Sequence, residues 1–571
     1  MENIEIARIF EDVADLLEML GASVFRIRAY RAAARTVETL GTPAESLLKK
    51  DVNALEALPG IGKDLAGKIR EIIETGKLTL LKELTVQIPE SVIQMIRIPG
   101  LGPKRAKQIY DQLGIVTLTG LEQAAREGRL RALRGWKETM EAKVLQGIAD
   151  LKAWRGRFRL VEADAAIRPL LERLEATQEL THLQVAGSYR RRRETVGDVD
   201  LLVTATAAEP VMERFLSAPE VKQVLAHGDT KSSIVLRQGL QVDLRVVDEE
   251  SLGAALHYFT GSKAHNIAVR TLGVKRGVKI NEYGVFLGSR RIAGHREADV
   301  FQAVGLPWIP PELREDRGEI DAASDGRLPA LVERGDIRGD LQMHTTYTDG
   351  RDSLADMVKA CGDRGYSYIA ITDHTKAVRV AGGLSREEFQ TQFREIDEIR
   401  KTGTGPAVLK SAEVDILDAG QLDLDDETLT ELDLVVVSVH SRFNMTKADM
   451  TQRVVRALRH PRVHVFAHPT GRLLGRREPY PLDMEEVILV AHDYGVLLEV
   501  NAQPDRLDLN DIYCQRARDA GVKLVISTDA HRIAELDNMR YGVDQARRGW
   551  CEPADIANTR SLDAFLKLIA K

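Results

Sequence analysis

Seven short apolar segments recur between residues 334 and 571, and each one carries or ends in polar residues of the kind that bind metal ions. Stretches with a helical spacing of apolar residues lie between them. A strand followed by a helix, repeated in this way, predicts a parallel β/α barrel one unit short of eight. The carboxyl ends of its strands would hold the functional residues. The segments are IRGDLQMHT, YSYIAITDH, AVLKSAEVDI, DLVVVSVH, VHVFAHPT, GVLLEVNA and KLVISTDAH.

The polar residues at these strand ends combine imidazoles with carboxylates. The chain has 3 cysteines, too few and too scattered for a disulfide framework or a cysteine zinc site, so a metal needs His and carboxylate ligands. Such ligands favour Mn²⁺, Zn²⁺ or Fe²⁺ over Mg²⁺ alone, and a set with one bridging carboxylate suits two or three ions. His460, His464 and His492 lie away from strand ends and are expected to be ordinary imidazoles. The candidate ligands are His344, Asp349, His374, Glu413, His440, His468, Asp529 and His531.

The chain is too long, at 571 residues, for one hydrophobic core, and its composition changes along its length. Residues 1–315 contain 46 Lys and Arg against 42 Asp and Glu, whereas residues 316–571 contain 34 against 44. The slight positive charge of the first part suits contact with a polyanion, and the negative charge of the second part suits the binding of cations. The balance of surface charge also varies along many large proteins without any functional reason. A stretch rich in Pro, Gly and charge predicts a linker. The expected segments are 1–84, 85–155, 156–249, 250–316, the linker at 317–333, and 334–571.

Residues 1–155 have the apolar spacing of helices, and two of the breaks between helices resemble each other. They are LPGIGKDLAGKI at 58–69 and IPGLGPKRAKQI at 98–109. The glycines allow a tight hairpin whose backbone N–H groups can approach a phosphate. One such turn is equally typical of an ordinary helix connection, but two copies favour a helix-hairpin-helix clamp on the DNA backbone. The candidate DNA-binding residues here are Gly60, Gly62, Lys68, Gly100, Gly102 and Lys104.

The stretch LQVAGSYRRRRETVGDVDLLVTA predicts a strand, a Gly-Ser turn and a second strand that carries Asp198 and Asp200. A strand period of two places both carboxylates on one face. Asp243 lies in GLQVDLRVVD, another alternating strand. Acids on strand edges are often only solvated, but three that converge repel one another unless divalent ions lie between them, and two Mg²⁺ ions serve an in-line phosphoryl displacement. The candidates for holding a polyphosphate are Gly187, Ser188 and Arg191.

These motifs resemble those of the family X DNA polymerases. GSYRR, GDVDLLV, VDLRVV, YFTGS and INEYG occur in the order typical of the family, and the resemblance extends to about residue 316. It implies an α+β nucleotidyltransferase palm and thumb that use dNTP on gapped or primer-template DNA in base excision repair. Asp198 and Asp200 would ligate both Mg²⁺ ions, and Asp243 would activate the primer 3′-hydroxyl. The resemblance assigns the incoming nucleotide to Tyr258, Phe259, Gly261 and Ser262, the minor-groove edge of the base to Asn266, the template side to Arg270, and a phosphate, with a lyase role second, to Lys68.

The C-terminal part, residues 334–571, resembles the polymerase and histidinol phosphatase (PHP) domain. DLQMHTTYTDG, ITDH, SAEVD, SVHS, AHPTG and STDAH follow the motif order of that family. The family usually opens with two histidines, whereas this chain has Gln342 and then His344. Because glutamine is a weak neutral donor, one ion is expected to bind loosely or through water. The resemblance implies a metal-dependent 3′-5′ exonuclease or 3′-end phosphoesterase.

Together, the motifs imply a multidomain repair polymerase with an α-helical N-terminal region, an α+β palm and thumb, and a distorted (β/α)7 barrel. Three alternatives stay open. The barrel would be a phosphatase or an abasic-site endonuclease, the palm would modify a small molecule or RNA, or the chain would be a non-catalytic scaffold at DNA ends.

No apolar run is long enough to span a membrane, and the N-terminus carries acidic residues where a signal peptide would carry basic ones. The expected protein is a monomer in the cytoplasm, at the nucleoid.

Overall fold

The computed structural model of the chain describes residues 3–38, 44, 47–48, 51, 53–56, 58, 60–96, 98, 101–154 and 157–570. The chain divides into two compact units. One comprises residues 1–155 with 475–477, and the other comprises residues 156–474 with 478–571. None of the helices in the described ranges is both long and apolar enough to cross a bilayer.

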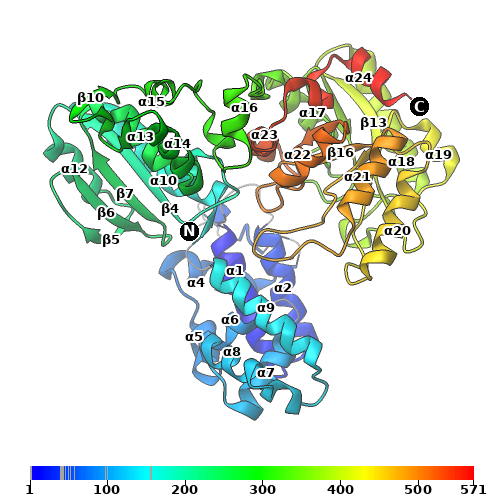
Figure 1. Ribbon diagram of the computed structural model, residues 1–571. Helices are drawn as coiled ribbons and strands as arrows, with labels where there is room; N and C mark the ends of the chain where they lie inside the picture. Colours follow the sequence, from blue (N-terminus) through cyan, green and yellow to red (C-terminus); the bar gives the residue numbers. More distant parts are fainter. Residues whose placement is uncertain are drawn as a thin grey trace. The chain divides into compact units, whose positions relative to one another are not determined.

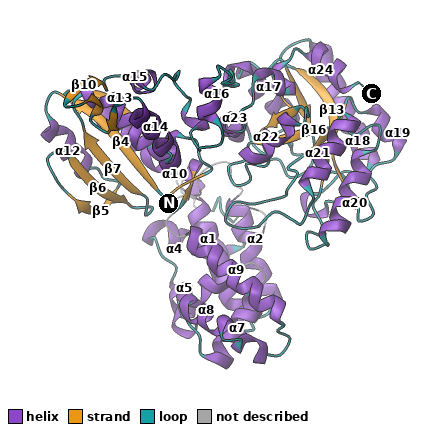
Figure 2. Cartoon of the chain, in the orientation of Figure 1, coloured by secondary structure: helices purple, strands orange, loops and turns teal. Residues whose placement is uncertain are grey.

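Where it is described, the first unit is helical, as its apolar spacing predicts (Figure 2). Its helices are amphipathic and bury their apolar faces in a single core. Gly76 and Gly114 end two of the helices in the left-handed conformation, with φ of 71° and 64°, where a glycine has no steric cost. The helices are α1 (Asn3–Met19), α2 (Val24–Glu38), α4 (Lys63–Thr75), α5 (Thr79–Gln87), α6 (Glu90–Ile96), α7 (Pro103–Leu113), α8 (Leu118–Arg126) and α9 (Glu138–Trp154).

A five-stranded mixed sheet follows in the second unit (Figure 1). Its order is β2-β4-β7-β6-β5, with β4 parallel to β7 and the other neighbours antiparallel. The apolar residues of these strands and of α10 and α12 form its core. The elements are α10 (Leu160–Glu175), β2 (Leu180–Val185), α11 (Gly187–Arg190), β4 (Asp198–Ala205), α12 (Ala208–Leu216), β5 (Val221–Ala226), β6 (Lys231–Leu236) and β7 (Gln241–Val246).

A smaller α+β subdomain comes next, with a three-stranded antiparallel sheet in the order β10-β9-β8. The segment 317–333, expected to be a linker, contains the short helix α16. Ala322 and Ala323 of α16 pack into the core of this subdomain. The elements are α13 (Leu252–Thr260), α14 (Lys263–Lys275), β8 (Lys279–Asn281), β9 (Gly284–Leu287), β10 (Arg290–Ala293), α15 (Glu297–Ala303) and α16 (Glu319–Ser324).

The C-terminal part is the predicted barrel of seven parallel strands, which lie side by side in the order of the sequence. A parallel bridge between Met343 and Ala530 joins the first strand region to the last, so the barrel is nearly closed. At the amino ends of the strands, Phe565 stacks on Tyr368 with ring centroids 5.5 Å apart. The strands are β11 (Gly339–Asp340), β12 (Tyr368–Ile371), β13 (Ala407–Asp415), β14 (Leu434–Ser438), β15 (Val465–Phe466), β16 (Leu497–Asn501) and β17 (Leu524–Ser527).

Two apolar cores lie on the two sides of this barrel wall. One joins the outward residues of the strands to the surrounding helices, and the other joins the inward residues to the last helix, α24, which covers the amino ends. The carboxyl ends are therefore the end left for a functional site. The helices are α17 (Leu354–Asp363), α18 (Arg386–Thr402), α19 (Asp426–Glu431), α20 (Lys447–Leu458), α21 (Met484–Tyr494), α22 (Asp511–Asp519), α23 (Met539–Arg548) and α24 (Leu562–Ile569).

Candidate metal centres

The eight candidate ligands of the barrel converge at the carboxyl ends of its strands. Seven of them form three overlapping groups whose ligand atoms lie within 4.8 Å of one another. The eighth, His468, contacts the same cluster through Glu413, with Nε2 and Oε1 2.8 Å apart. The groups are His344 with Asp349, His374 and His531; His374 with Glu413 and His440; and His344 with Glu413 and Asp529.

Glu413 is the centre of the cluster, because both of its oxygens face imidazoles. Its Oε2 lies 3.4 Å from His344 Nε2 and 3.3 Å from His374 Nδ1, and its Oε1 lies 3.4 Å from His440 Nε2. Burial would raise the pKa of Glu413, but the imidazoles of His374, His440 and His468 hold that pKa well below its ordinary value. Glu413 is therefore the carboxylate placed to bridge ions.

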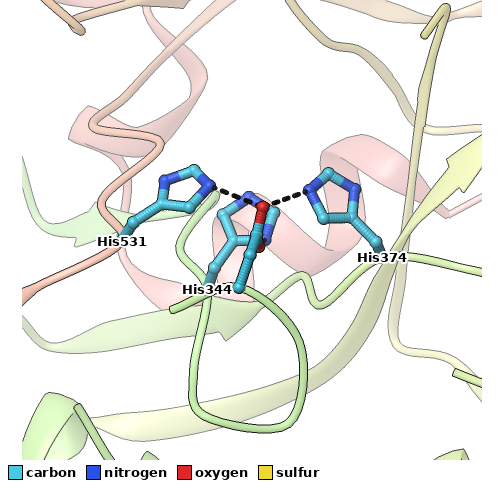
Figure 3. A group of neighbouring side chains, drawn as sticks. His344, His374 and His531 are labelled. Atoms are coloured by element: carbon cyan, nitrogen blue, oxygen red, sulfur yellow. Dashed lines mark ion pairs between the residues drawn. The ribbon is translucent and has the colours of Figure 1, made fainter. Parts of the chain in front are cut away.

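Asp349 closes the other side of the cluster. Its Oδ2 lies 3.6 Å from Nε2 of His374 and 3.6 Å from Nε2 of His531, on either side of the stacked ring of His344 (Figure 3). Burial opposes ionisation of Asp349, but the neighbouring imidazoles of His374 and His531 lower its pKa. Burial likewise opposes protonation of His531, yet Asp349 and Asp529 raise its pKa to about 10. The carboxylates here are held as anions beside nitrogen donors.

The donor set fits divalent ions. Nδ1 of His344, His374 and His468 is buried and has no hydrogen-bond partner among the residues that the structure describes. Buried polar atoms are normally paired, so unpaired ring nitrogens beside carboxylates are typical of metal ligands. Two of the candidate ligands also have positive φ, 29° for His468 and 51° for Asp529, a conformation that non-glycine residues retain mainly at functional sites.

Gln342 is buried, and its backbone lies beside the candidate ligand Asp529. Both polar atoms of its side chain lack a hydrogen-bond partner within the described part of the chain. Its backbone carbonyl accepts the N–H of Asp529, with a distance of 2.9 Å between N and O. The weak-donor interpretation of Gln342 stays a prediction.

The three histidines that the sequence places away from the strand ends lie outside the cluster. His464 Nδ1 accepts the backbone N–H of Val435 at 2.9 Å. His460 lies 3.2 Å from Asp426, and His492 lies 3.3 Å from its neighbour Asp493. These imidazoles have ordinary hydrogen-bond or ion-pair partners, and their role as ordinary imidazoles stays a prediction.

In the five-stranded sheet, the parallel register places Asp200 of β4 directly opposite Asp243 of β7, with Asp198 one period earlier on β4. Gln241 Nε2 donates to Asp243 Oδ1 at 2.9 Å. Gly187 has φ of 67°, and a Cβ there would lie 3.1 Å from Asp200 Oδ2, so a larger residue would strain the turn. Burial, Asp198 and Asp243 raise the pKa of Asp200 to about 6. Among the described residues, groups of at least three ligand atoms within 4.8 Å of one another occur only in the barrel. The three aspartates of the sheet are therefore spaced more loosely than the barrel residues.

Most of the candidate nucleotide-binding residues lie on or just after α11 and α13, two helices that pack against β4. Ser188 is in α11, and Tyr258 and Phe259 lie at the end of α13 with ring centroids 5.1 Å apart. Arg191 donates to the carbonyl of Thr260, and its Nε lies 3.1 Å from Glu315. The guanidinium thus already joins the turn to the neighbouring subdomain, and a polyphosphate would compete with Glu315 for it.

Gly261 and Ser262 form the connection from α13 to α14. The Ser262 hydroxyl caps α14 by accepting the N–H of His265 at 3.3 Å, and Gly261 has φ of 66°. Asn266 Nδ2 donates to the carbonyl of Tyr258 at 2.7 Å. Arg270 is exposed on the same helix. Four of the candidate residues for nucleotide and template therefore lie close together in the chain, on α14 and the connection that leads into it.

A helix follows each of the two glycine motifs of the first unit, as predicted. Gly62 is the N-cap residue of α4 and Gly102 that of α7, and Gly60 has φ of 74°. Lys68, on α4, forms an ion pair with Asp64 one turn earlier. Lys104 is exposed at the start of α7, and Gly100 lies outside the described residues.

Comparison with known protein families covers most of the chain. Residues 161–252 match the DNA polymerase beta palm, and residues 255–315 match the DNA polymerase beta thumb. Residues 1–78 match a helix-hairpin-helix domain, residues 92–150 a SAM-like helix-hairpin-helix tandem, and residues 340–502 the PHP domain.

A full-length relative decides the assignment. The chain is 38% identical over 574 residues to the DNA polymerase/3′-5′ exonuclease PolX of Bacillus subtilis, covering 99% of this chain and 100% of the relative. The chain belongs to the PHP-containing family X DNA polymerases. Both resemblances noted in the sequence are thereby confirmed.

Other relatives match only parts of this family X polymerase. DNA polymerase lambda of Arabidopsis thaliana is 26% identical over 348 residues, 55% of this chain and 62% of the relative. A probable phosphatase of Thermoanaerobacter is 26% identical over 204 residues, 34% of this chain and 78% of the relative. One relative is thus named a polymerase and the other a phosphatase.

Sequence reasoning missed the polar residues that hold the candidate barrel ligands of this family X polymerase in place. Asp415 Oδ1 accepts the backbone N–H of His440 at 3.0 Å, and Glu499 Oε2 accepts that of His468 at 2.7 Å. Asn501 Nδ2 donates to Glu499 and, at 3.0 Å, to Asp529. Each of them lies in one of the seven segments, so their position near strand ends was the available signal.

The raised pKa of Asp200 predicts a pH dependence of stability in EDTA. A carboxyl whose pKa is about 6 when folded stabilises the fold below its ordinary pKa of 3.8 and loses that contribution as the pH rises through about 6. Between pH 4 and pH 7 we expect the free energy of unfolding of the wild type to fall by about 2 kcal/mol relative to Asp200→Asn. Urea unfolding at several pH values measures this change in the free energy of unfolding. The control is Asp229→Asn, a substitution at an exposed position. Parallel pH curves for the wild type and Asp200→Asn would contradict the shift.

Proposed function

We propose that the chain fills short gaps in DNA during base excision repair and trims DNA 3′ ends with its barrel. The observation that carries this proposal is the presence of two separate groups of metal-type ligands. Three aspartates lie on β4 and β7 of the palm, and eight His and carboxylate residues lie at the barrel ends. Synthesis and hydrolysis act on the same primer end in opposite directions, so separate sites allow both.

In the palm, Asp198 and Asp200 would hold two Mg²⁺ ions, with Asp243 the residue that accepts the proton of the primer 3′-hydroxyl. Such an ion pair supplies charge neutralisation for in-line phosphoryl transfer. Asp243 is suited to this role because Gln241 holds one of its carboxylate oxygens by a hydrogen bond and leaves the other oxygen to accept the proton. Tyr258 and Phe259 would exclude a 2′-hydroxyl and so select dNTP.

In the barrel, the eight ligands would hold two or three ions of Mn²⁺, Zn²⁺ or Fe²⁺. Ions at such a site supply Lewis acidity for hydrolysis of a phosphodiester. Glu413 would be shared between them, since its two oxygens face different imidazoles. With Gln342 in place of an imidazole, one of the metal positions would bind its ion more weakly.

DNA would be held by its backbone through the two hairpins. The N-cap glycines Gly62 and Gly102 leave helix N–H groups open to a phosphate. Lys68 and Lys104 add positive charge close to these turns, and Arg270 would meet the template side. We place the protein at the nucleoid in the cytoplasm, as a monomer.

A second candidate function is hydrolysis of small phosphate esters, and the matched phosphatase favours it. The excess of acidic residues in segment 316–571 is also unlike a DNA-binding groove. Cutting at abasic sites is a third use of the same ligands. A non-catalytic scaffold is disfavoured by the convergence of the barrel ligands.

One assay separates the two centres. A 5′-labelled primer on gapped DNA is incubated with dNTPs and Mg²⁺ or Mn²⁺, using the wild type, Asp198→Ala/Asp200→Ala and His468→Ala. We expect extension to be lost only in the double variant and shortening only in His468→Ala. Pyrophosphate, a small phosphate ester and abasic-site DNA serve as competing substrates. Loss of both activities in either variant, or faster hydrolysis of the small ester than of DNA, would refute the proposal.

A further inference from the structure

Arg506 lies beside the barrel centre, and its guanidinium has donors to spare. Its Nε lies 3.7 Å from Oδ2 of the candidate ligand Asp529, and 20% of its side chain is exposed. Within the described residues, this ion pair is the only hydrogen bond or ion pair that the side chain of Arg506 makes. By contrast, Arg453 is buried and donates to backbone carbonyls, including those of Ile416 and Ser441. The donors of Arg453 are used by the fold, and most of those of Arg506 are not.

We propose that Arg506 binds the phosphate group that is hydrolysed at the barrel centre. The inference rests on the proposed phosphoesterase function and names a substrate-binding residue for it. Once the carboxylate of Asp529 binds a cation it no longer offsets the charge of Arg506, so the guanidinium favours a further anion there. A phosphodiester is such an anion, and the planar guanidinium can meet two of its oxygens at once.

The turn that carries Arg506 is tied to the metal ligands. The backbone N–H groups of Arg506 and Leu507 both donate to the carbonyl of Gln503, each at 2.9 Å. Gln503 Nε2 in turn donates to the backbone carbonyl of Asp529 at 2.8 Å. The guanidinium and the ligand that it faces are therefore held by one hydrogen-bonded turn, which reduces the entropy lost when a phosphate is bound.

The palm holds the other side of this turn. Leu507 is buried in the palm core together with Tyr541, and its φ of 44° is rare for leucine. Its carbonyl accepts a hydrogen bond from Arg472, whose Nη2 also lies 2.7 Å from Glu194 of the palm. Such a conformation persists only where the surroundings determine it, so the position of Arg506 depends on packing between palm and barrel.

The test compares Arg506→Gln and Arg506→Lys with Arg516→Gln, a control in which an exposed arginine paired with Glu485 is changed. Calorimetry measures binding of inorganic phosphate to the Mn²⁺-loaded full chain, and elemental analysis measures bound Mn²⁺. Steady-state kinetics on a 3′-labelled single-stranded oligonucleotide gives KM and kcat.

For Arg506→Gln we expect phosphate affinity to fall and KM to rise, each about 10-fold or more, because a charge-assisted bidentate contact is lost. Bound Mn²⁺ should stay at the wild-type level, Arg506→Lys should recover part of the affinity, and Arg516→Gln should match the wild type. Unchanged phosphate affinity, or a loss of Mn²⁺ that accounts for the whole effect, would overturn the assignment. A wild type that binds phosphate through Arg506 but degrades no DNA would refute the exonuclease and leave this assignment standing.

Discussion

Glu413→Gln is expected to reduce shortening of DNA 3′ ends about 1,000-fold or more, because it removes the central ligand of the barrel. The Glu413 carboxylate is buried and faces four imidazoles, those of His344, His374, His440 and His468. A neutral amide cannot offset the charge of the metal ions or be shared between them. The number of bound Mn²⁺ ions per chain should also fall. Both quantities are measured on the full chain, by primer shortening and by elemental analysis.

The matched control is Glu398→Gln, an exposed glutamate on α18 that pairs with Lys401. It should keep wild-type shortening and metal content. Extension of a gapped primer should be unchanged in both variants, since the palm carboxylates lie on other strands. A Glu413→Gln protein that still shortens DNA at the wild-type rate would show that the barrel cluster is not the hydrolytic site.

Asp243→Asn is expected to slow nucleotide incorporation by about 100- to 10,000-fold, the range typical of losing a general base. Asp243 lies opposite Asp200 on the neighbouring parallel strand, and its partner Gln241 can still hydrogen-bond to an amide. The fold should therefore survive while the proton acceptor is lost. Single-turnover incorporation on gapped DNA measures the rate.

Glu213→Gln, on an exposed position of α12, is the control for this variant and should incorporate nucleotides normally. Shortening of 3′ ends should remain at the wild-type level in Asp243→Asn. If incorporation fell less than about 10-fold, Asp243 could not be the general base of the palm. A parallel fall in shortening would instead indicate that the two centres are not independent.

Much of the candidate site was predictable because its residues follow the period of regular elements. Asp198 and Asp200 are two residues apart on one strand, and the barrel ligands come at or just after the ends of successive apolar segments. Parallel strands in consecutive order bring such ends together whatever the loops do. The convergence of His374, His440 and Glu413 follows from that rule.

Other features had no signal in a linear pattern. Nothing in the sequence shows that Leu507 would leave the barrel and enter the palm core, or that Tyr541 would donate to Asp164 at 2.7 Å across 377 positions. The partner of Arg191 was also unpredicted, because Glu315 lies 124 residues away. Contacts of this kind depend on how domains pack, and no short-range period encodes them.

The sequence by itself determined the family, the order of the domains and the residues that converge at each centre, since motif order and strand periodicity are local properties. Only the tertiary structure decided which carboxylate faces the imidazoles, which arginine faces Asp529 and which turn joins the palm to the barrel. The physical reason is that hydrogen bonding and burial depend on every neighbour in space, and most of those neighbours are distant in the chain.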